Sequence, residues 1–174
     1  MKLLRKTIHP SIDSIDSKSF WERPATRGII VKNNEILLLY TERYDDFSLP
    51  GGGVDDGEDI IEGLKRELSE ETGAQNIREV IPFGKYEEYR QCTRTEFDLV
   101  FITSYCYLCK IDDELGATKY ESYEKKNGMT PRWIDINKAI DHNQKTLSNS
   151  PKSGFSIERE LYLLNLIRDH FKLF

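Results

Sequence analysis

Short apolar runs and alternating polar positions predict that much of the chain forms β-strands. Residues 25–33 and 35–42 are two such runs, and the Asn-Asn pair where they meet favours a turn, so together they predict a β-hairpin. Residues 77–90 and 96–111 are also strand-rich and are expected to pair with each other. A further short strand is expected from residue 131.

Three segments are expected to be helical. Residues 59–72 repeat apolar side chains at helical spacing, and Gly73 follows where a helix commonly ends. A short helix is expected over residues 136–142, and an amphipathic helix over residues 156–172. The apolar stripe of this last helix is formed by Leu161, Leu164, Ile167 and Phe171. Such a stripe either caps the core or makes a contact between two copies of the chain.

The remaining segments are polar or irregular. Residues 1–22 are expected to form a loosely attached arm, residues 116–130 a polar loop and residues 147–154 a linker. We therefore divide the chain into the arm at 1–22, a main domain at 23–145, and a linker with a C-terminal helix at 146–174 that packs on the same domain. Strands combined with two or three helices in this order predict a mixed α/β sandwich.

Composition and charge narrow the possible partners. The 174 residues suffice for one domain, and 38% hydrophobic with 32% charged residues is a globular composition. The net charge of -5 disfavours nonspecific binding to nucleic acid or to an anionic membrane. The longest apolar run, residues 101–109, is too short and too polar to span a bilayer, and no targeting signal is visible, so a cytoplasmic location is expected.

The three cysteines argue against a disulfide framework. Cys106 and Cys109 form a CxxC motif, but this motif lies inside a predicted strand. A zinc site needs a second pair of ligands at suitable spacing, which the sequence lacks. We expect buried, reduced thiols, with a metal or redox role as the alternative.

The most unusual segment is residues 51–74, in which eight of 24 residues are acidic. On a helix, Glu67, Glu70 and Glu71 form one cluster that borders the apolar stripe. Glu67 and Glu71 repel each other, and partial burial increases that cost. Arg66 can pair with Glu70, which offsets one charge only. The remaining charge predicts a hard divalent cation, Mg²⁺ or Mn²⁺, whereas a solvated acidic helix face would predict no dependence on metal.

The segment from Gly52 to Ala74 resembles the Nudix box, G-x5-E-x7-R-E-U-x-E-E-x-G-U, where U is a bulky aliphatic residue. The matching positions are Gly52, Glu58, Arg66, Glu67, Leu68, Glu70, Glu71 and Gly73. Ala74 is smaller than the usual last residue, which concerns packing rather than chemistry. A strand and a glycine loop are expected before the box and a strand after it, as the motif requires. The looser resemblance in strand order covers roughly residues 24–142.

This resemblance implies an α/β (α+β) fold, a Nudix-type α/β/α sandwich with a mixed sheet and a C-terminal helix. It implies a hydrolase that uses Mg²⁺ or Mn²⁺ to cleave the diphosphate linkage of a nucleoside diphosphate joined to another moiety. Homodimers are common in the family, so a homodimer is a further expectation. The implied metal ligands are Glu67, Glu70, Glu71 and the carbonyl group of Gly51. Glu67 also acts as, or near, the general base in some members, while Glu58 and Arg66 support the site.

Members of the family often place another glutamate before the last core strand. Glu121 and Glu124 lie in that position here, with an ordinary charged loop as the alternative. The residues that we expect in catalysis are therefore Glu67, Glu70, Arg66 and Glu124. Weaker candidates are Glu87, Glu88 and Glu96.

Sequence features that would select a substrate are faint. Tyr86 and Tyr89 lie near the place where a tyrosine accompanies dinucleoside polyphosphate hydrolases in this family, although a tyrosine within a strand is more often a packing residue. The proline that often marks ADP-ribose pyrophosphatases is not found at residue 89, and Pro82 is too early. Aromatic residues that could stack on a base are Phe20, Trp21, Tyr44 and Phe47. Arginines that could bind phosphate are Arg23, Arg27, Arg43, Arg90 and Arg94. His142 and His170 are expected on helix surfaces.

A second function class stays open at this point. Some Nudix-like domains no longer hydrolyse and instead sense a nucleotide or a sugar phosphate. This chain keeps every acidic residue of the box, which favours the enzyme and a small nucleotide-type diphosphate as its partner.

Overall fold

The fold is described from a computed structural model of residues 1–173. Its larger sheet has the strand order β1-β6-β7-β2. These strands are β1 (Leu3–Ile8), β6 (Arg78–Gln91), β7 (Leu99–Lys110) and β2 (Phe20–Ile29). β6 and β7 form the expected antiparallel pair, whereas β1 and β2 join them in parallel, so the sheet is mixed.

The second sheet is antiparallel and is built around β4 (Glu35–Thr41). The short strands β3 (Val31–Lys32) and β5 (Asp46–Ser48) pair with β4, as does β8 (Met129–Asp135). The expected hairpin at Asn33 and Asn34 is therefore present between β3 and β4, but it is shorter than predicted, because residues 25–29 belong to β2 and pair with β7. Both asparagines have positive φ, which suits a tight hairpin turn.

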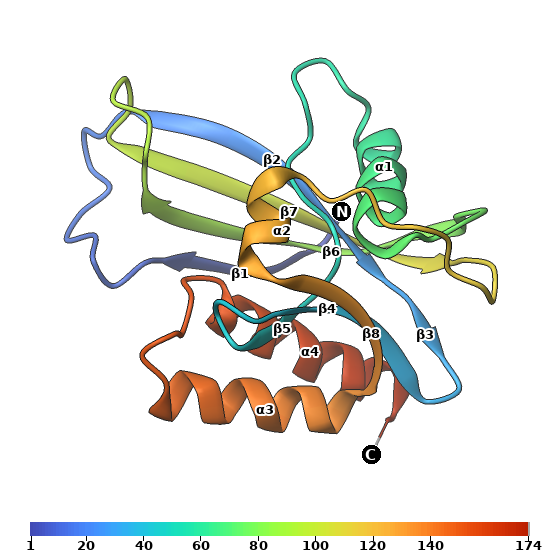
Figure 1. Cartoon of the computed structure of the whole chain (residues 1–174). Helices are drawn as coiled ribbons and strands as arrows, with labels where there is room; N and C mark the ends of the chain where they lie inside the picture. Colours follow the sequence, from blue (N-terminus) through green and yellow to red (C-terminus); the bar gives the residue numbers. More distant parts are fainter. Residues whose placement is uncertain (174) are drawn as a thin grey trace.

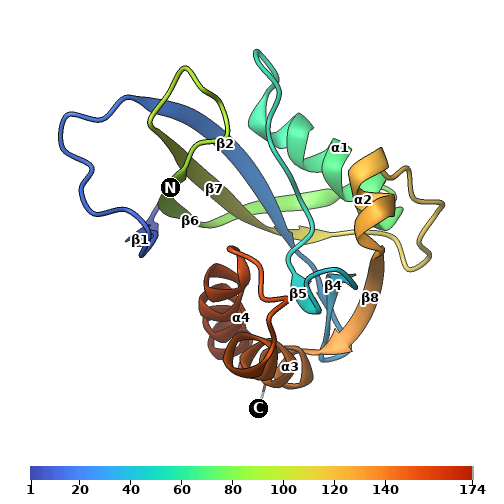
Figure 2. The same ribbon diagram turned by 60° about the vertical axis from the view of Figure 1, so that its left-hand side comes forward.

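Helices lie on both sides of these strands (Figures 1 and 2). α1 (Ile60–Thr72) packs on β2 and β8, whereas α3 (Ile136–Asn149) and α4 (Ile157–Phe171) pack on each other and on β5. The short helix α2 (Ser122–Asn127) precedes β8. This arrangement confirms the predicted α/β sandwich with a mixed sheet and a C-terminal helix.

Apolar side chains fill the space on both faces of β4. Ile36 and Leu38 belong to the core beneath α3 and α4, whereas Leu37 belongs to the core beneath α1. Successive side chains of a strand point to opposite faces, so a strand covered on both sides needs an unbroken apolar run. The run Ile36–Leu39 meets that need and is buried throughout.

The prediction of an irregular arm over residues 1–22 is wrong in part. Residues Leu3–Ile8 form β1, which pairs in parallel with β6, and β2 already begins at Phe20. β1 is a partly exposed edge strand with little apolar alternation, so its sequence gives a weak strand signal. Leu4 packs closely over Gly84, where a Cβ atom would lie 2.5 Å from the leucine side chain. The division of the chain at residues 22 and 145 stays a prediction.

Two helix predictions also need correction. The helix expected over 136–142 continues to Asn149, through the first three residues of the predicted linker at 147–154. Its second half buries two polar side chains, Asn143 and Thr146, because both form hydrogen bonds with the chain at residues 45–47. α2 lies within the predicted polar loop of residues 116–130. Polar residues on a buried face conceal the periodicity from which a helix is predicted.

Two further predictions concern the cysteines and the C-terminal helix. Cys106 and Cys109 are buried free thiols that belong to the two different core layers, so they lie on opposite faces of β7. Burial raises the pKa of each thiol to about 12. α4 covers the core through Leu161, Leu164 and Ile167, whereas Phe171, the fourth residue of the predicted stripe, is exposed. Within residues 1–173, no helix is long and apolar enough to cross a membrane.

Candidate functional site

The start and end of α1 are fixed by the sequence around it. The side chain of Asp59 accepts hydrogen bonds from the backbone of Ile61 and Glu62, which satisfies two free donors at the first turn. Gly73 adopts the left-handed conformation, with φ of 72°, and closes the last turn. The buried residues Leu64 and Leu68 then fix the rotation of the helix, so that its glutamates face the loop before it.

That loop contains Gly51, Gly52 and Gly53, and it runs beside β2. The N–H of Thr26 donates to the carbonyl of Gly52, and Ala25 forms a β-bridge with Gly53. Gly51 has φ of 131°, and a Cβ atom there would lie 2.1 Å from the carbonyl oxygen of Thr26. The loop can therefore run this close to β2 only because glycine is present.

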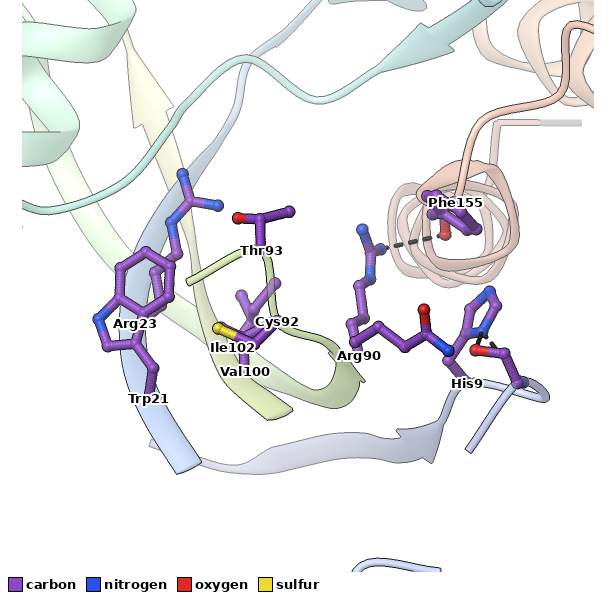
Figure 3. A pocket seen from close by; sticks show the side chains of 11 residues that line it. His9, Trp21, Arg23, Arg90, Cys92, Thr93, Val100, Ile102 and Phe155 are labelled. Carbon is purple, nitrogen blue, oxygen red and sulfur yellow. Dashed lines mark hydrogen bonds between the residues drawn. The ribbon is translucent and has the colours of Figure 1, made fainter. Parts of the chain in front are cut away.

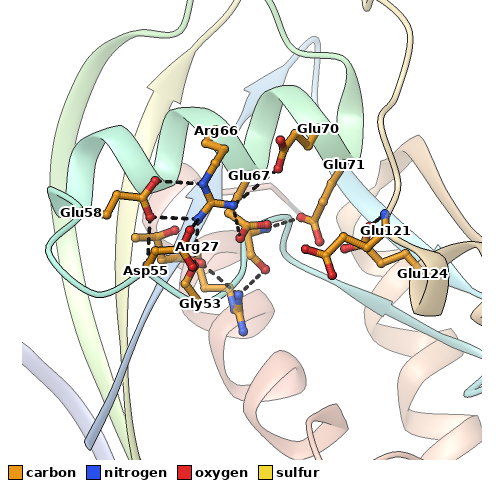
Figure 4. Close-up of polar contacts among 12 residues, drawn as sticks. Arg27, Gly53, Asp55, Glu58, Arg66, Glu67, Glu70, Glu71, Glu121 and Glu124 are labelled. Atoms are coloured by element: carbon orange, nitrogen blue, oxygen red, sulfur yellow. Dashed lines mark hydrogen bonds and ion pairs between the residues drawn. The ribbon is translucent and has the colours of Figure 1, made fainter.

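Arg66 is the central cation on the exposed side of α1 (Figure 4). Its guanidinium group donates two hydrogen bonds of 2.9 Å to Glu58 and one of 2.8 Å to Glu67. A longer contact of 3.4 Å reaches Glu70, as the spacing predicts. Arg66 also donates to the carbonyl of Gly53, which ties the helix to the loop. The bidentate bond from Arg66 lowers the pKa of Glu58 to about 2.

Glu71 lies at the buried end of the acidic cluster. Its carboxylate accepts a 2.6 Å hydrogen bond from the N–H of Gly51, and only 5% of the residue is exposed. Burial raises the pKa of Glu71 to about 8, and the charges of Glu67 and Glu124 act in the same direction. The bond from Gly51 and the charge of Arg27 oppose that rise. A buried carboxylate in this state gains from any added cation.

Glu67 lies between Arg66 and the loop. A Cβ atom at Gly52 would stand 2.5 Å from its carboxylate, so the carboxylate rests directly on the glycine backbone. Burial raises the pKa of Glu67, while Arg66 opposes the rise. Glu70, by contrast, keeps a side chain that is 39% exposed. The three predicted acids therefore differ in their surroundings, from the buried Glu71 to the open Glu70.

Glu124 reaches the site from α2, outside the box. Figure 4 shows Glu124 opposite Glu67 and Glu71, and its charge raises the pKa of both. Its carboxylate accepts bonds from the N–H of Glu121, at 2.6 Å, and from the hydroxyl group of Tyr123. Glu124 is buried, whereas Glu121 is exposed, so of the two predicted candidates Glu124 is the one enclosed with the acids of α1.

Arg27 is a second buried cation at this place. Its guanidinium group donates to the carbonyls of Thr26 and Gly51, and burial lowers its pKa. The carbonyl of Gly51 is the one predicted to bind a metal ion, so this oxygen already faces a cation. The sequence analysis included Arg27 only among five possible phosphate ligands. Its position on β2, where the glycine loop crosses, could not be inferred without the fold.

The acidic site, as we call Glu58, Glu67, Glu70, Glu71 and Glu124, brings five carboxylates to two guanidinium groups. Within residues 1–173, no three carboxylate, thiol or imidazole groups stand close enough together to hold a metal ion as they are. The donor set still suits Mg²⁺ or Mn²⁺, because it consists of oxygen atoms and carries excess negative charge. Glu67 and Glu71 contact the glycine loop directly, and Glu124 faces both of them from α2.

Other predicted residues lie elsewhere. Glu87 and Glu88 of β6 form ion pairs with Lys85 and with Arg90 and Arg159, and Glu96 is in an exposed loop, so none of these three joins the acidic site. Tyr86 and Tyr89 are buried packing residues. Phe47 is in the core, Tyr44 contacts Arg43, His142 bonds to Asp45, and His170 packs on Phe83.

A buried group beneath the glycine loop is not among the residues predicted from the sequence. Glu160 of α4 is fully buried and accepts a 2.9 Å hydrogen bond from the N–H of Leu49. Arg159 beside it bonds to both Glu160 and Glu88. One signal was available: Glu160 lies four positions before Leu164 and therefore on the apolar stripe of α4, where a charged residue needs a buried partner.

Comparison with known proteins agrees with this geometry. The model of the NUDIX domain family matches residues 22–153. Nudix hydrolase 12, mitochondrial, from Arabidopsis thaliana is 26% identical over 112 residues, which is 64% of this chain and 53% of that protein. An ADP-ribose pyrophosphatase from Methanocaldococcus jannaschii is 37% identical over 76 residues, 42% of this chain and 38% of that protein.

A solved NUDIX hydrolase from Nitrosomonas europaea aligns with a TM-score of 0.49 at 15% identity, covering 79% of this chain and 95% of its own. The match to Nudix hydrolase 12 spans about half of the length of that relative. The family match includes β2, the glycine loop, α1 and α2, which together form the acidic site. This chain belongs to the Nudix family.

Proposed function

We propose that this protein hydrolyses the diphosphate linkage of a nucleoside diphosphate joined to another moiety, with Mg²⁺ or Mn²⁺ as its cofactor. The observation that carries the proposal is the excess of carboxylates over guanidinium groups at the glycine loop. Among these carboxylates, Glu71 is buried, and its pKa is raised by burial and by the neighbouring negative charges. Such an excess costs stability unless a cation offsets it. The name of the archaeal relative, an ADP-ribose pyrophosphatase, supports the same bond type.

Glu67, Glu70, Glu71 and the Gly51 carbonyl would hold the metal ion. When bound, the ion neutralises charge on the diphosphate oxygens and makes a water molecule more acidic. Glu67 would accept a proton from the attacking water molecule, because its carboxylate lies directly against the glycine loop. Arg66 would hold Glu67 in place through the 2.8 Å bond, while Glu124 would close the site from α2.

Arg27 has a separate part in this proposal. Because it donates to the Gly51 carbonyl, its guanidinium group partly offsets the acidic site while no metal is bound. On metal binding, that group would be free to contact an oxygen of the substrate. We propose a cytoplasmic location and a homodimer as further properties of this protein.

The test is release of a phosphomonoester from a panel of nucleoside diphosphate derivatives in the presence of Mg²⁺. We expect Glu67→Gln and Glu71→Gln to lower kcat by at least about 10²-fold, because each removes a negative oxygen that holds the ion. Glu62→Gln is the matched control, since Glu62 lies on the same helix but is exposed and pairs only with Lys65.

Equal turnover by wild type and both variants would contradict the proposal. Tight, Mg²⁺-dependent nucleotide binding without turnover would instead identify the sensing module as the function.

A further inference from the structure

β5 is an edge strand of the second sheet, and buried side chains of α3 and α4 bind its outer edge. A side chain of α3 donates to the carbonyl of Asp45. The amide of Asn143 accepts from the N–H of Phe47 and donates to its carbonyl, each at 2.8 Å. Glu160 of α4 continues this series, because it accepts from the N–H of Leu49 at 2.9 Å. Alternate residues of a strand present their backbone groups to the same edge, so these helix side chains together fix the register of β5.

Leu49 connects this edge to the glycine loop. It lies two residues before Gly51, and the residue between them is a proline, whose ring fixes one backbone torsion angle. The N–H of Gly51 donates to Glu71, and its carbonyl accepts from Arg27. These two contacts come from α1 and β2, whereas Glu160 holds the same segment from α4. A displacement of Leu49 would therefore be passed on to the backbone groups of Gly51.

The negative charge of Glu160 is more than the binding of a strand backbone requires. At Phe47, the neutral amide of Asn143 is sufficient. Glu160 is fully buried, and a buried carboxylate costs stability unless it is paired, as it is here with Arg159. In return, a carboxylate accepts a stronger hydrogen bond from an N–H than a neutral oxygen does. The charge also reaches Arg27, because burial and Arg159 lower the pKa of Arg27 whereas Glu160 opposes them.

Arg159 joins Glu160 to a second buried carboxylate, which does not belong to the loop. Glu88 of β6 accepts from Arg159 through one oxygen and from Arg90 through the other. Arg90 also donates a 3.1 Å hydrogen bond to the carbonyl of Phe155, in the segment before α4 (Figure 3). Glu160 divides its oxygens in the same way, between Arg159 and the backbone that enters the glycine loop. The two glutamates thus share burial, charge and an arginine, but of the two it is Glu160 that binds the loop segment.

We propose that Glu160 is a positioning residue for diphosphate hydrolysis, which holds the backbone of Gly51 in place through Leu49. This inference rests on the proposed function, because the Gly51 carbonyl would bind the metal ion. Glu160 acts through the loop backbone and not on the substrate itself. Loss of this support should therefore weaken metal binding and lower kcat, while KM for the substrate changes little at saturating Mg²⁺.

The test compares Glu160→Gln with the matched control Glu88→Gln, at a temperature at which both full-length variants are folded. Each change removes one buried carboxylate from Arg159, so both should lower stability. The first readout is Mn²⁺ binding without substrate, measured by isothermal titration calorimetry. Glu160→Gln should raise the dissociation constant of Mn²⁺ about tenfold, whereas Glu88→Gln should change it less than about twofold.

The second readout is kinetics at saturating Mg²⁺, with a nucleoside diphosphate derivative that wild type hydrolyses. Glu160→Gln should lower kcat about tenfold and change KM less than about twofold. Glu160→Asp and Glu88→Asp keep the inference testable if a glutamine variant folds poorly. Aspartate retains the charge but is one methylene group shorter. The long side chain of Arg159 can follow it, whereas the backbone of Leu49 cannot, so Mn²⁺ binding should again weaken at position 160 only.

Equal Mn²⁺ affinities of the variants at positions 160 and 88 would overturn the inference, because a purely structural role affects both positions alike. The two proposals fail separately. Selective loss of Mn²⁺ binding in Glu160→Gln, without turnover of any substrate by wild type, keeps Glu160 as the support of the metal site and removes the hydrolase. Turnover by wild type with equal effects of the two changes keeps the hydrolase and removes the positioning role.

Discussion

Arg66 and Arg159 each gather carboxylates around one guanidinium group, but the two clusters differ in charge balance and in burial. Arg66 forms ion pairs with Glu58, Glu67 and Glu70 on α1 and the loop before it, and its side chain is 29% exposed. Arg159 forms ion pairs with Glu88 and Glu160 beneath the glycine loop, and its side chain is 6% exposed. Arg90 adds a second cation to the buried cluster.

The buried cluster is balanced, with two carboxylates and two guanidinium groups. The acidic site is not, because its five carboxylates face only Arg66 and Arg27. Both clusters contain several ion pairs, so the presence of ion pairs does not distinguish them. Charge excess, rather than the presence of an arginine or a glutamate, marks the place where a further cation can bind, whereas a balanced buried set supports the fold.

The largest expected effect comes from breaking the balanced cluster. Arg159→Met should lower the free energy of unfolding by about 3–5 kcal/mol, because it leaves the buried Glu160 without its ion-pair partner and Glu88 with Arg90 alone. Chemical denaturation of wild type and variant measures the difference. Arg132→Met, at an exposed position of β8, should change it by less than about 0.5 kcal/mol. A small effect of Arg159→Met would show that the buried cluster contributes little to stability.

Mg²⁺ should stabilise the protein by binding at the acidic site and not at the balanced cluster around Arg159. At a concentration about a hundredfold above its dissociation constant, Mg²⁺ should add roughly 2.7 kcal/mol to the stability of wild type. Glu71→Gln should lose most of this gain, while Arg168→Met on α4 should keep it. Thermal unfolding with Mg²⁺ and with EDTA gives the comparison. A gain that is equal in wild type and Glu71→Gln would remove Glu71 from the metal site.

The free energy of unfolding of the metal-free protein should depend on pH, because burial disfavours the ionised form of Glu71. Its pKa is raised to about 8 in the fold, from an ordinary value of 4.5, so the folded state favours the protonated acid. The stability that this preference contributes is complete below pH 4.5 and is lost as the pH rises toward 8. Relative to Glu71→Gln, wild type should therefore lose roughly 3.5 kcal/mol between pH 5 and 8. Parallel stability curves for the two proteins in EDTA would contradict this.

A smaller effect is expected from a single methyl group in the loop. Gly52→Ala would place a Cβ atom 2.5 Å from the carboxylate of Glu67, so that side chain must move. We expect kcat to fall about tenfold, since a small displacement of a proton acceptor is costly. The free energy of unfolding should change by less than about 1 kcal/mol, because Gly52 does not need the left-handed conformation. Unchanged kcat would show that Glu67 is not constrained by the loop.

The sequence predicted those parts of the molecule whose signals are local. α1 was predicted with both ends correct, because Asp59, Gly73 and the spacing of Leu64 and Leu68 act within one helix. The paired strands β6 and β7 were predicted for the same reason. β1 was missed because its stability comes from pairing with β6, some 80 residues later in the chain.

The same distinction applies to the site. The spacing of the box glutamates indicated one face of a helix, and the fold has them there. The burial of Glu71, the position of Arg27 and the bond from Leu49 to Glu160 each depend on contacts between distant elements. Spacing along one helix cannot show how deep a side chain lies or which strand crosses above it.

The hydrogen bond from Leu49 to Glu160 joins residues separated by 111 positions, and Glu160 lies beyond the part of the chain that matches the family. During synthesis, the loop leaves the ribosome long before the helix that supports it. A nascent chain that ends after residue 153 would have α1 and the glutamates of its box but an unsatisfied backbone donor under the loop. Activity should therefore develop only after α4 has been made and has docked.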